Sequence, residues 1–172
     1  MGKDVPLKLP PLVWKSPDGT CTVAIARRCF LAMRDMAVEH GPREVGTSLV
    51  GQYQHDGRKA WVLGLAPLTL DSKATRWTFI RGIRGLDDFF RRILHRYRGK
   101  RHYIGEWHSH PSAAPIASIT DDRNQAELSR AEQSRCPTPI LVIVGGDLRQ
   151  KPSLGVYIHM RQGSRIDLLP VL

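Results

Sequence analysis

Two histidines and a later carboxylate are the residues of this chain best suited to chemistry. His108-Ser109-His110 places two imidazoles two positions apart, and Asp121 follows eleven positions after the second. Two histidines and one carboxylate are the protein ligands of many catalytic zinc sites, which keep a fourth position open. The set therefore predicts a metal-dependent hydrolase, although the same three ligands can also hold non-haem iron.

The histidines are expected at the end of a strand, because residues 103–107 are aromatic and β-branched. Alternate side chains of a strand share a face. The even-numbered side chains expected on one face are Ile104, Glu106, His108 and His110. Those expected on the other face are Tyr103, Trp107 and Ser109. Two imidazoles at this spacing can converge on one ion, and Pro111, which has no backbone N–H, is expected to end the strand.

A helix is expected to follow over residues 119–132, which contain neither glycine nor proline. Asp121 then lies in its first turn and can point back at the end of the strand. Ser118 and Asp121 also fit the S/T-x-x-D/E capping box, in which the serine only starts the helix. Capping and metal ligation are compatible, because Ser118 could begin the helix that presents Asp121.

Hydrolysis at such a site needs a general base, and two glutamates are candidates. Glu44 opens the apolar, glycine-containing run 45–51, which is typical of a buried strand. Glu106 lies on the histidine face, one strand position back, where it could instead hold an imidazole in one tautomer. The residues alone favour Glu44 only slightly over Glu106.

Other metal motifs are missing from the sequence. It contains no H-E-x-x-H, and no P-C-x-x-C follows a His-x-Glu pair. Cys21, Cys29 and Cys136 have no C-x-x-C spacing, which argues against a structural cysteine site. An odd number of cysteines without a secretory signal favours a cytoplasmic protein. No apolar run is long enough to span a membrane.

Glu44, His108-Ser109-His110 and the pair Ser118 and Asp121 together resemble the JAMM motif of the JAB/MPN metalloproteases. The spacing from the first histidine to the aspartate matches in full, and the resemblance covers roughly residues 20–160. Residues 105–111 are most similar to the stand-alone bacterial members, which include JAB isopeptidases encoded beside E1-like and E2-like enzymes in anti-phage operons. Many members carry Gly-Gly after the motif glutamate, where this chain has residues 45–47, Val-Gly-Thr. That departure removes no catalytic group.

The resemblance implies a role for each motif residue. His108, His110 and Asp121 would bind one catalytic zinc ion, Glu44 would be the general base, and Ser118 would donate a hydrogen bond to the oxyanion. The implied enzyme is an isopeptidase, similar to deubiquitinases, that cleaves after the C-terminal glycine of a ubiquitin-like modifier. The implied setting is a bacterial anti-phage conjugation system. Its partners would be the modifier, its conjugates, and the E1-like and E2-like proteins of the same operon.

Three other functions stay open. A processing peptidase of a ubiquitin-like or sulfur-carrier precursor would use the same site. A non-catalytic MPN scaffold is disfavoured because every motif group is present. The formal net charge of +10 would suit binding to nucleic acid or to an acidic protein partner. The sequence has no RRM, KH or helix-turn-helix pattern, which disfavours nucleic acid. The basic residues concentrate in one stretch: Arg81, Arg84, Arg91, Arg92, Arg96, Arg98, Lys100 and Arg101.

The chain length favours one domain, residues 20–172, preceded by a proline-rich extended arm, residues 1–19. Irregularly mixed strands and helices predict an α+β layered fold. The resemblance implies the same class, a curved mixed sheet flanked by helices, similar to the cytidine deaminases. Helices are expected at 22–39 and 86–98, and further strands at 45–54, 59–66, 140–144, 154–160 and 164–169.

The segment 67–85 is expected to be an irregular insertion. Residues 70–85 lie where the family places a segment that pairs with the extended C-terminal tail of the substrate, a known mode of peptide recognition. Trp77 and Phe79 lie within it. The alternative is that both aromatic side chains are core anchors.

Overall fold

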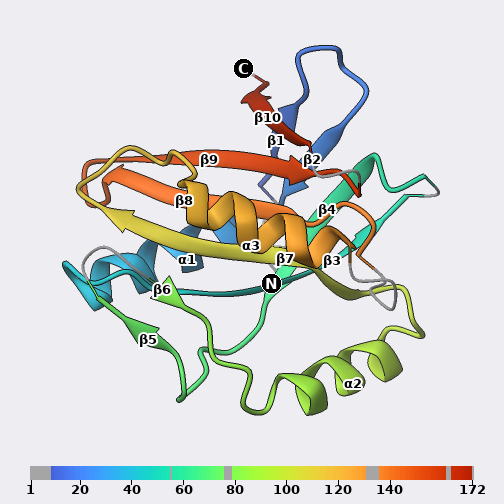
Figure 1. The fold of residues 1–172 in the computed structure, drawn as a ribbon, viewed down its shortest axis with the longest axis horizontal. Helices are drawn as coiled ribbons and strands as arrows, with labels where there is room; N and C mark the ends of the chain where they lie inside the picture. Colours follow the sequence, from blue (N-terminus) through green and yellow to red (C-terminus); the bar gives the residue numbers. More distant parts are fainter. Residues whose placement is uncertain (1–8, 55, 76–78, 131–135, 162–163, 172) are drawn as a thin grey trace, which may run out of the picture.

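A closed mixed sheet organises the molecule. Residues 9–54, 56–75, 79–130, 136–161 and 164–171 are described by this structure, a computed structural model. Within them, eight strands pair in the order β1-β10-β9-β8-β7-β3-β4-β2, and β2 closes on β1 (Figure 1). These strands are β1 (Leu12–Lys15), β2 (Thr22–Ile25), β3 (Gly46–Tyr53), β4 (Lys59–Leu65), β7 (His102–Pro111), β8 (Ile140–Asp147), β9 (Lys151–His159) and β10 (Arg165–Pro170). Neighbours run antiparallel, except that β7 is parallel to β8 and β2 to β4.

Helices cover both faces of the sheet. They are α1 (Arg27–His40), α2 (Leu86–Arg96) and α3 (Ile119–Arg130). In Figure 1, α1 lies behind the sheet and α3 in front of it. Met33 and Ala37 of α1 are fully buried in the main core, and Phe90 of α2 packs edge-on against Tyr103 of β7. The predicted α+β fold with a curved mixed sheet flanked by helices is confirmed. The helix predicted at 119–132 is α3, described as far as residue 130.

The first predicted helix is wrong at its start. Residues 22–25 form β2, and the helix begins only at Arg27. Val23 and Ile25 are completely buried, and β2 pairs with β1 on one edge and β4 on the other. A short apolar, β-branched run fits a strand or a helix equally well from its pattern, and only the neighbouring strands decide. Part of the expected N-terminal arm also belongs to the sheet, since Leu12–Lys15 is β1.

The expected alternation along β7 breaks at Gly105. Gly105 has φ +143°, and the register shifts there, so that Ile104 has no partner opposite it on β3. This is a β-bulge, which reverses the facing of the residues on one side of it. Ile104 therefore lies in the main core with Trp107, while Tyr103 turns its hydroxyl to Glu106. The prediction was wrong in placing Ile104 with the histidines and Tyr103 with Trp107. Glu106 does share its face with the histidines.

The insertion before α2 contains a short hairpin, β5 (Lys73–Ala74) paired with β6 (Phe79–Ile80). Trp77, predicted to contact the substrate or to anchor the core, lies outside the described residues. The basic side chains of α2 are exposed: Arg91, Arg92 and Arg96. No helix among the described residues is long and apolar enough to cross a membrane.

Candidate metal centre

The three predicted ligands meet where β7 ends and α3 begins. The Nε2 atoms of His108 and His110 are 3.0 Å apart, and Nε2 of His108 is 3.5 Å from Oδ1 of Asp121. The three ligand atoms all lie within 4.8 Å of one another. A tetrahedral zinc ion with bonds near 2.05 Å spaces its ligand atoms about 3.3 Å apart. The group could therefore hold one metal ion.

The protonation of the histidines suits a cation. Burial holds the pKa of His108 below its usual range, against the opposing effect of Asp121. His108 is therefore neutral at physiological pH, and its Nε2 lone pair is available to bind a metal ion. Nδ1 of His110 lies 3.3 Å from the carbonyl oxygen of Ala114, a contact that requires the hydrogen on Nδ1. That tautomer leaves Nε2 of His110 free to coordinate.

Ser109, between the histidines, joins β7 to the residue after Glu44. Its Oγ accepts a hydrogen bond from the backbone N–H of Val45 at 3.0 Å, and its own N–H donates to the carbonyl of Val45 at 2.8 Å. Ser109 is completely buried. The sequence predicts no role for Ser109, and only its place inside the motif indicates one.

Gly46 permits this close approach of β3 to β7. A Cβ atom there would overlap the carbonyl of Trp107 and the Cβ of His108. Any larger residue at position 46 would therefore push β3 away from the histidine strand. Thr47, which departs from the Gly-Gly of the motif that the sequence resembles, is accommodated, since its hydroxyl donates to the carbonyl of Pro67 at 3.0 Å.

Glu44 lies beside the group, with Oε1 4.0 Å from Nε2 of His110. Burial, aided by the negative charge of Asp121, raises the pKa of Glu44 to about 7. A carboxylate with a pKa near neutrality can both take and return a proton. A bound cation would lower that pKa, because an opposite charge favours the carboxylate.

Glu106, the other candidate base, is engaged elsewhere. Its Oε1 lies 2.6 Å from Nε of Arg81 and accepts a hydrogen bond from the hydroxyl of Tyr103 at 3.2 Å. Arg81 directly follows β6, so this ion pair ties the insertion to the histidine strand. Glu106 is thus engaged by Arg81 and Tyr103, whereas Glu44, which the resemblance implies as the base, lies beside the histidines; its role as the base stays a prediction.

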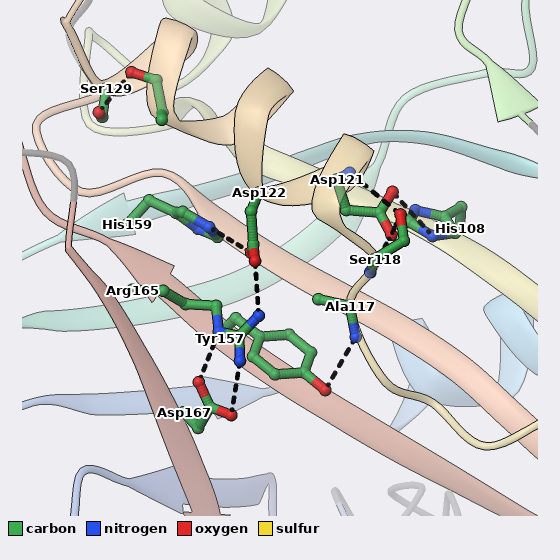
Figure 2. A network of polar contacts seen from close by, with 11 residues as sticks. His108, Ala117, Ser118, Asp121, Asp122, Ser129, Tyr157, His159, Arg165 and Asp167 are labelled. Carbon is green, nitrogen blue, oxygen red and sulfur yellow. Dashed lines mark hydrogen bonds and ion pairs between the residues drawn. The ribbon is translucent and has the colours of Figure 1, made fainter.

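Ser118 and Asp121 form the predicted capping box. The hydroxyl and the backbone N–H of Ser118 both donate to Oδ2 of Asp121, at 2.7 and 2.8 Å, and the N–H of Asp121 donates to Oγ of Ser118 at 3.2 Å. Figure 2 shows both side chains turned toward His108. Asp121 thus uses one oxygen for the cap and the other for the histidine. The oxyanion role of Ser118 stays a prediction.

The group opens into a cleft of about 880 Å³. One wall is β6 with Arg81, and the other is α3, including Gln125 and Leu128. Glu106 and His108 line the space between them. Ile80 of β6 is 64% exposed at this wall.

A mixed sheet presents two histidines at a strand end, against a carboxylate in the next helix, and this group could hold a metal ion. Residues 26–155 match the family described as prokaryotic homologs of the JAB domain, and the chain belongs to this family. The predicted resemblance is confirmed.

Two individual proteins are similar to this chain. The chain is 30% identical over 167 residues to a CD-NTase/cGAS isopeptidase of Enterobacter hormaechei subsp. hoffmannii (strain UCI 50), covering 96% of this chain and 91% of the relative. The solution structure of protein DSY2949 from Desulfitobacterium hafniense matches with a TM-score of 0.56 at 18% identity, over 87% of this chain and 89% of that one. The second likeness concerns the fold alone.

Proposed function

We propose that this protein is a zinc-dependent isopeptidase that hydrolyses the bond after the C-terminal glycine of a ubiquitin-like modifier. The observation that carries the proposal is the convergence of His108, His110 and Asp121 within 4.8 Å, with Glu44 4.0 Å from one of the histidines. The relative named as an isopeptidase supports the reaction class.

Each residue has a distinct task in this reaction. His108, His110 and Asp121 would hold the ion, and zinc at this position would lower the pKa of a water molecule and polarise a carbonyl oxygen. Glu44 accepts the proton of the attacking water and donates it to the leaving amine as the C–N bond breaks. Ser118 donates its hydroxyl hydrogen to the carbonyl oxygen as that oxygen gains negative charge.

The cleft suits an extended peptide tail. Among the described residues β6 pairs only with β5, so its other edge can accept a substrate strand through backbone hydrogen bonds. Ile80 offers apolar surface at that wall. A folded modifier would then lie outside the cleft with only its C-terminal tail at the metal, and generic unfolded protein would be a poor substrate.

The proposed setting is a bacterial anti-phage conjugation system in the cytoplasm. The name of the Enterobacter relative, CD-NTase/cGAS isopeptidase, supports this setting. The proposed partners are the modifier, its conjugates and the E1-like and E2-like proteins encoded with it. Processing of a ubiquitin-like or sulfur-carrier precursor breaks the same bond after glycine, so it is the second candidate.

One experiment separates these functions. The purified protein is analysed for zinc, then incubated with the modifier encoded nearby as a C-terminal fusion, as a lysine conjugate, and beside casein. We expect about one zinc per chain, cleavage of the conjugate, and intact casein. Cleavage of the fusion alone would assign a processing peptidase. Bound zinc without any cleavage would assign a scaffold, and equal cleavage of casein would exclude a modifier-specific enzyme.

A further inference from the structure

The start of α3 is held by polar contacts rather than by an apolar core. The fully buried side chains of this helix are Gln125 and Ser129, both polar, and Ile119 at its first position is 80% exposed. A helix that buries little apolar surface gains little from the hydrophobic effect. The position of Asp121 therefore depends on specific polar contacts between α3 and the sheet.

Asp122, the neighbour of Asp121, makes these contacts with the last two strands. Its Oδ1 accepts a hydrogen bond from Nε2 of His159 at 3.1 Å, and its Oδ2 accepts one from Nη1 of Arg165 at 2.7 Å (Figure 2). His159 belongs to β9 and is 1% exposed, and Arg165 belongs to β10. Both partners are thus anchored in the sheet.

Arg165 is itself held in place. Its Nε and Nη2 donate to the two carboxylate oxygens of Asp167, at 2.7 and 3.2 Å. The guanidinium therefore makes a two-point contact with Asp167 and keeps Nη1 for Asp122, which a lysine ammonium could not reproduce. This arrangement restricts where the carboxylate of Asp122 can lie.

Tyr157 fixes the loop that leads into the helix. Its hydroxyl donates to the carbonyl of Pro115 at 2.7 Å and accepts from the N–H of Ala117 at 3.3 Å. Ala117 directly precedes Ser118, and Arg165 lies 5.2 Å from the centre of the Tyr157 ring. The loop before Ser118 and the turn after it are therefore held by the same two strands.

We propose that Asp122, Arg165 and Tyr157 are positioning residues that hold the Asp121 carboxylate in place for the metal ion. The inference rests on the proposed metal site. None of the three lines the cleft, so each acts through the start of α3. Residues that orient a metal ligand commonly change metal affinity ten- to hundredfold when removed. A merely structural ion pair at a partly exposed site would instead add little stability and leave the metal affinity unchanged.

The test measures the zinc dissociation constant of the full chain by competition with a chelator. We expect Asp122→Ala and Arg165→Ala each to weaken binding roughly tenfold or more. The double variant should lose less affinity than the sum of the two single losses, because both changes remove the Asp122–Arg165 contact. Tyr157→Phe, which keeps the ring, should weaken binding less. The control is Asp35→Ala, which removes the exposed Arg34–Asp35 ion pair of 2.7 Å on α1 and should change nothing.

Two further measurements separate positioning from stability. The melting temperature of the metal-free variants shows whether they fold, and the visible spectrum of bound Co²⁺ reports the geometry of the ligands. Asp122→Asn keeps the shape of the side chain and serves if the alanine variant fails to fold. Wild-type affinity and spectrum in folded Asp122 and Arg165 variants, or additive losses in the double variant, would overturn this inference alone. A wild-type chain that binds no zinc would overturn the proposed function and this inference together.

Discussion

Ser109 of β7 and Val45, the residue before β3, exchange two hydrogen bonds, one through the serine hydroxyl and one between backbones. The two residues are 64 positions apart in the chain. Their contact sets the position of Glu44, one residue before Val45, relative to the histidines on either side of Ser109. The candidate base and the candidate ligands are thus connected through a residue that does no chemistry itself.

We expect Ser109→Ala to lower kcat more than it raises KM. The change leaves the buried N–H of Val45 without an acceptor, at a cost of about 1–3 kcal/mol, and frees Glu44 to move. The matched control is Ser48→Ala on β3, since Ser48 is equally buried but its hydroxyl finds no partner among the described residues. Steady-state kinetics and melting temperatures of both variants check this, and equal kcat values would contradict it.

Glu44→Gln should abolish turnover while zinc content and fold are retained. The amide cannot accept the proton, and removing a carboxylate that burial already disfavours should not lower stability. Glu106→Gln should mainly raise KM, because it weakens the ion pair that ties Arg81 and β6 to β7. Kinetics with elemental analysis of both variants distinguish the two bases. An active Glu44 variant beside an inactive Glu106 variant would reverse the assignment.

Ser118 can be tested apart from its role as a helix cap. Ser118→Ala should reduce kcat by roughly 10²-fold, the usual scale for losing one oxyanion donor, and cost about 1 kcal/mol as a lost cap. Glycine is tolerated at the cap at a cost of only a few tenths of a kcal/mol. Ser118→Gly should therefore keep the melting temperature and still lose the rate. Wild-type kcat in the glycine variant would leave capping as the whole role.

Removal of the metal should destabilise the fold. An ion that binds only the folded chain adds stability in proportion to the logarithm of its concentration over its Kd. We expect a chelator to lower the melting temperature of the wild type, and zinc to restore it. In His108→Ala the chelator should have no such effect, because a ligand is gone. An identical shift in both proteins would show that the ion binds elsewhere.

The wall of the cleft should determine modifier binding. Ile80→Ser should raise KM for a modifier substrate without lowering the melting temperature, because the side chain is 64% exposed. Ile83→Ser is the control, since Ile83 is 70% exposed but does not line the cleft. Phe79 also lines the cleft, and Thr78 lies outside the described residues. Equal KM values for the two variants would exclude β6 from substrate binding.

The sequence by itself determined the ligand set and the local elements that carry it. His108 and His110 share a face because strand side chains alternate, and Asp121 lies in a first helical turn because Ser118 caps the helix three residues earlier. These relationships span a few residues, so local backbone geometry is sufficient to predict them. The family resemblance adds Glu44, which is far from the histidines in the chain and which no local geometry places beside them.

The tertiary structure decided what depends on distant partners. The residue pattern alone leaves Glu44 and Glu106 nearly equal, and the resemblance favours Glu44; the tertiary structure adds the pairing of β3 with β7 and the ion pair of Glu106 with Arg81. The bulge at Gly105 and the strand at residues 22–25 depend on neighbouring strands, which no local periodicity encodes. The contact of Asp122 with Arg165 joins residues 43 positions apart and was invisible in the sequence. Such pairs form only when the closed sheet brings its strands together, because their energy comes from partners that the chain meets on folding.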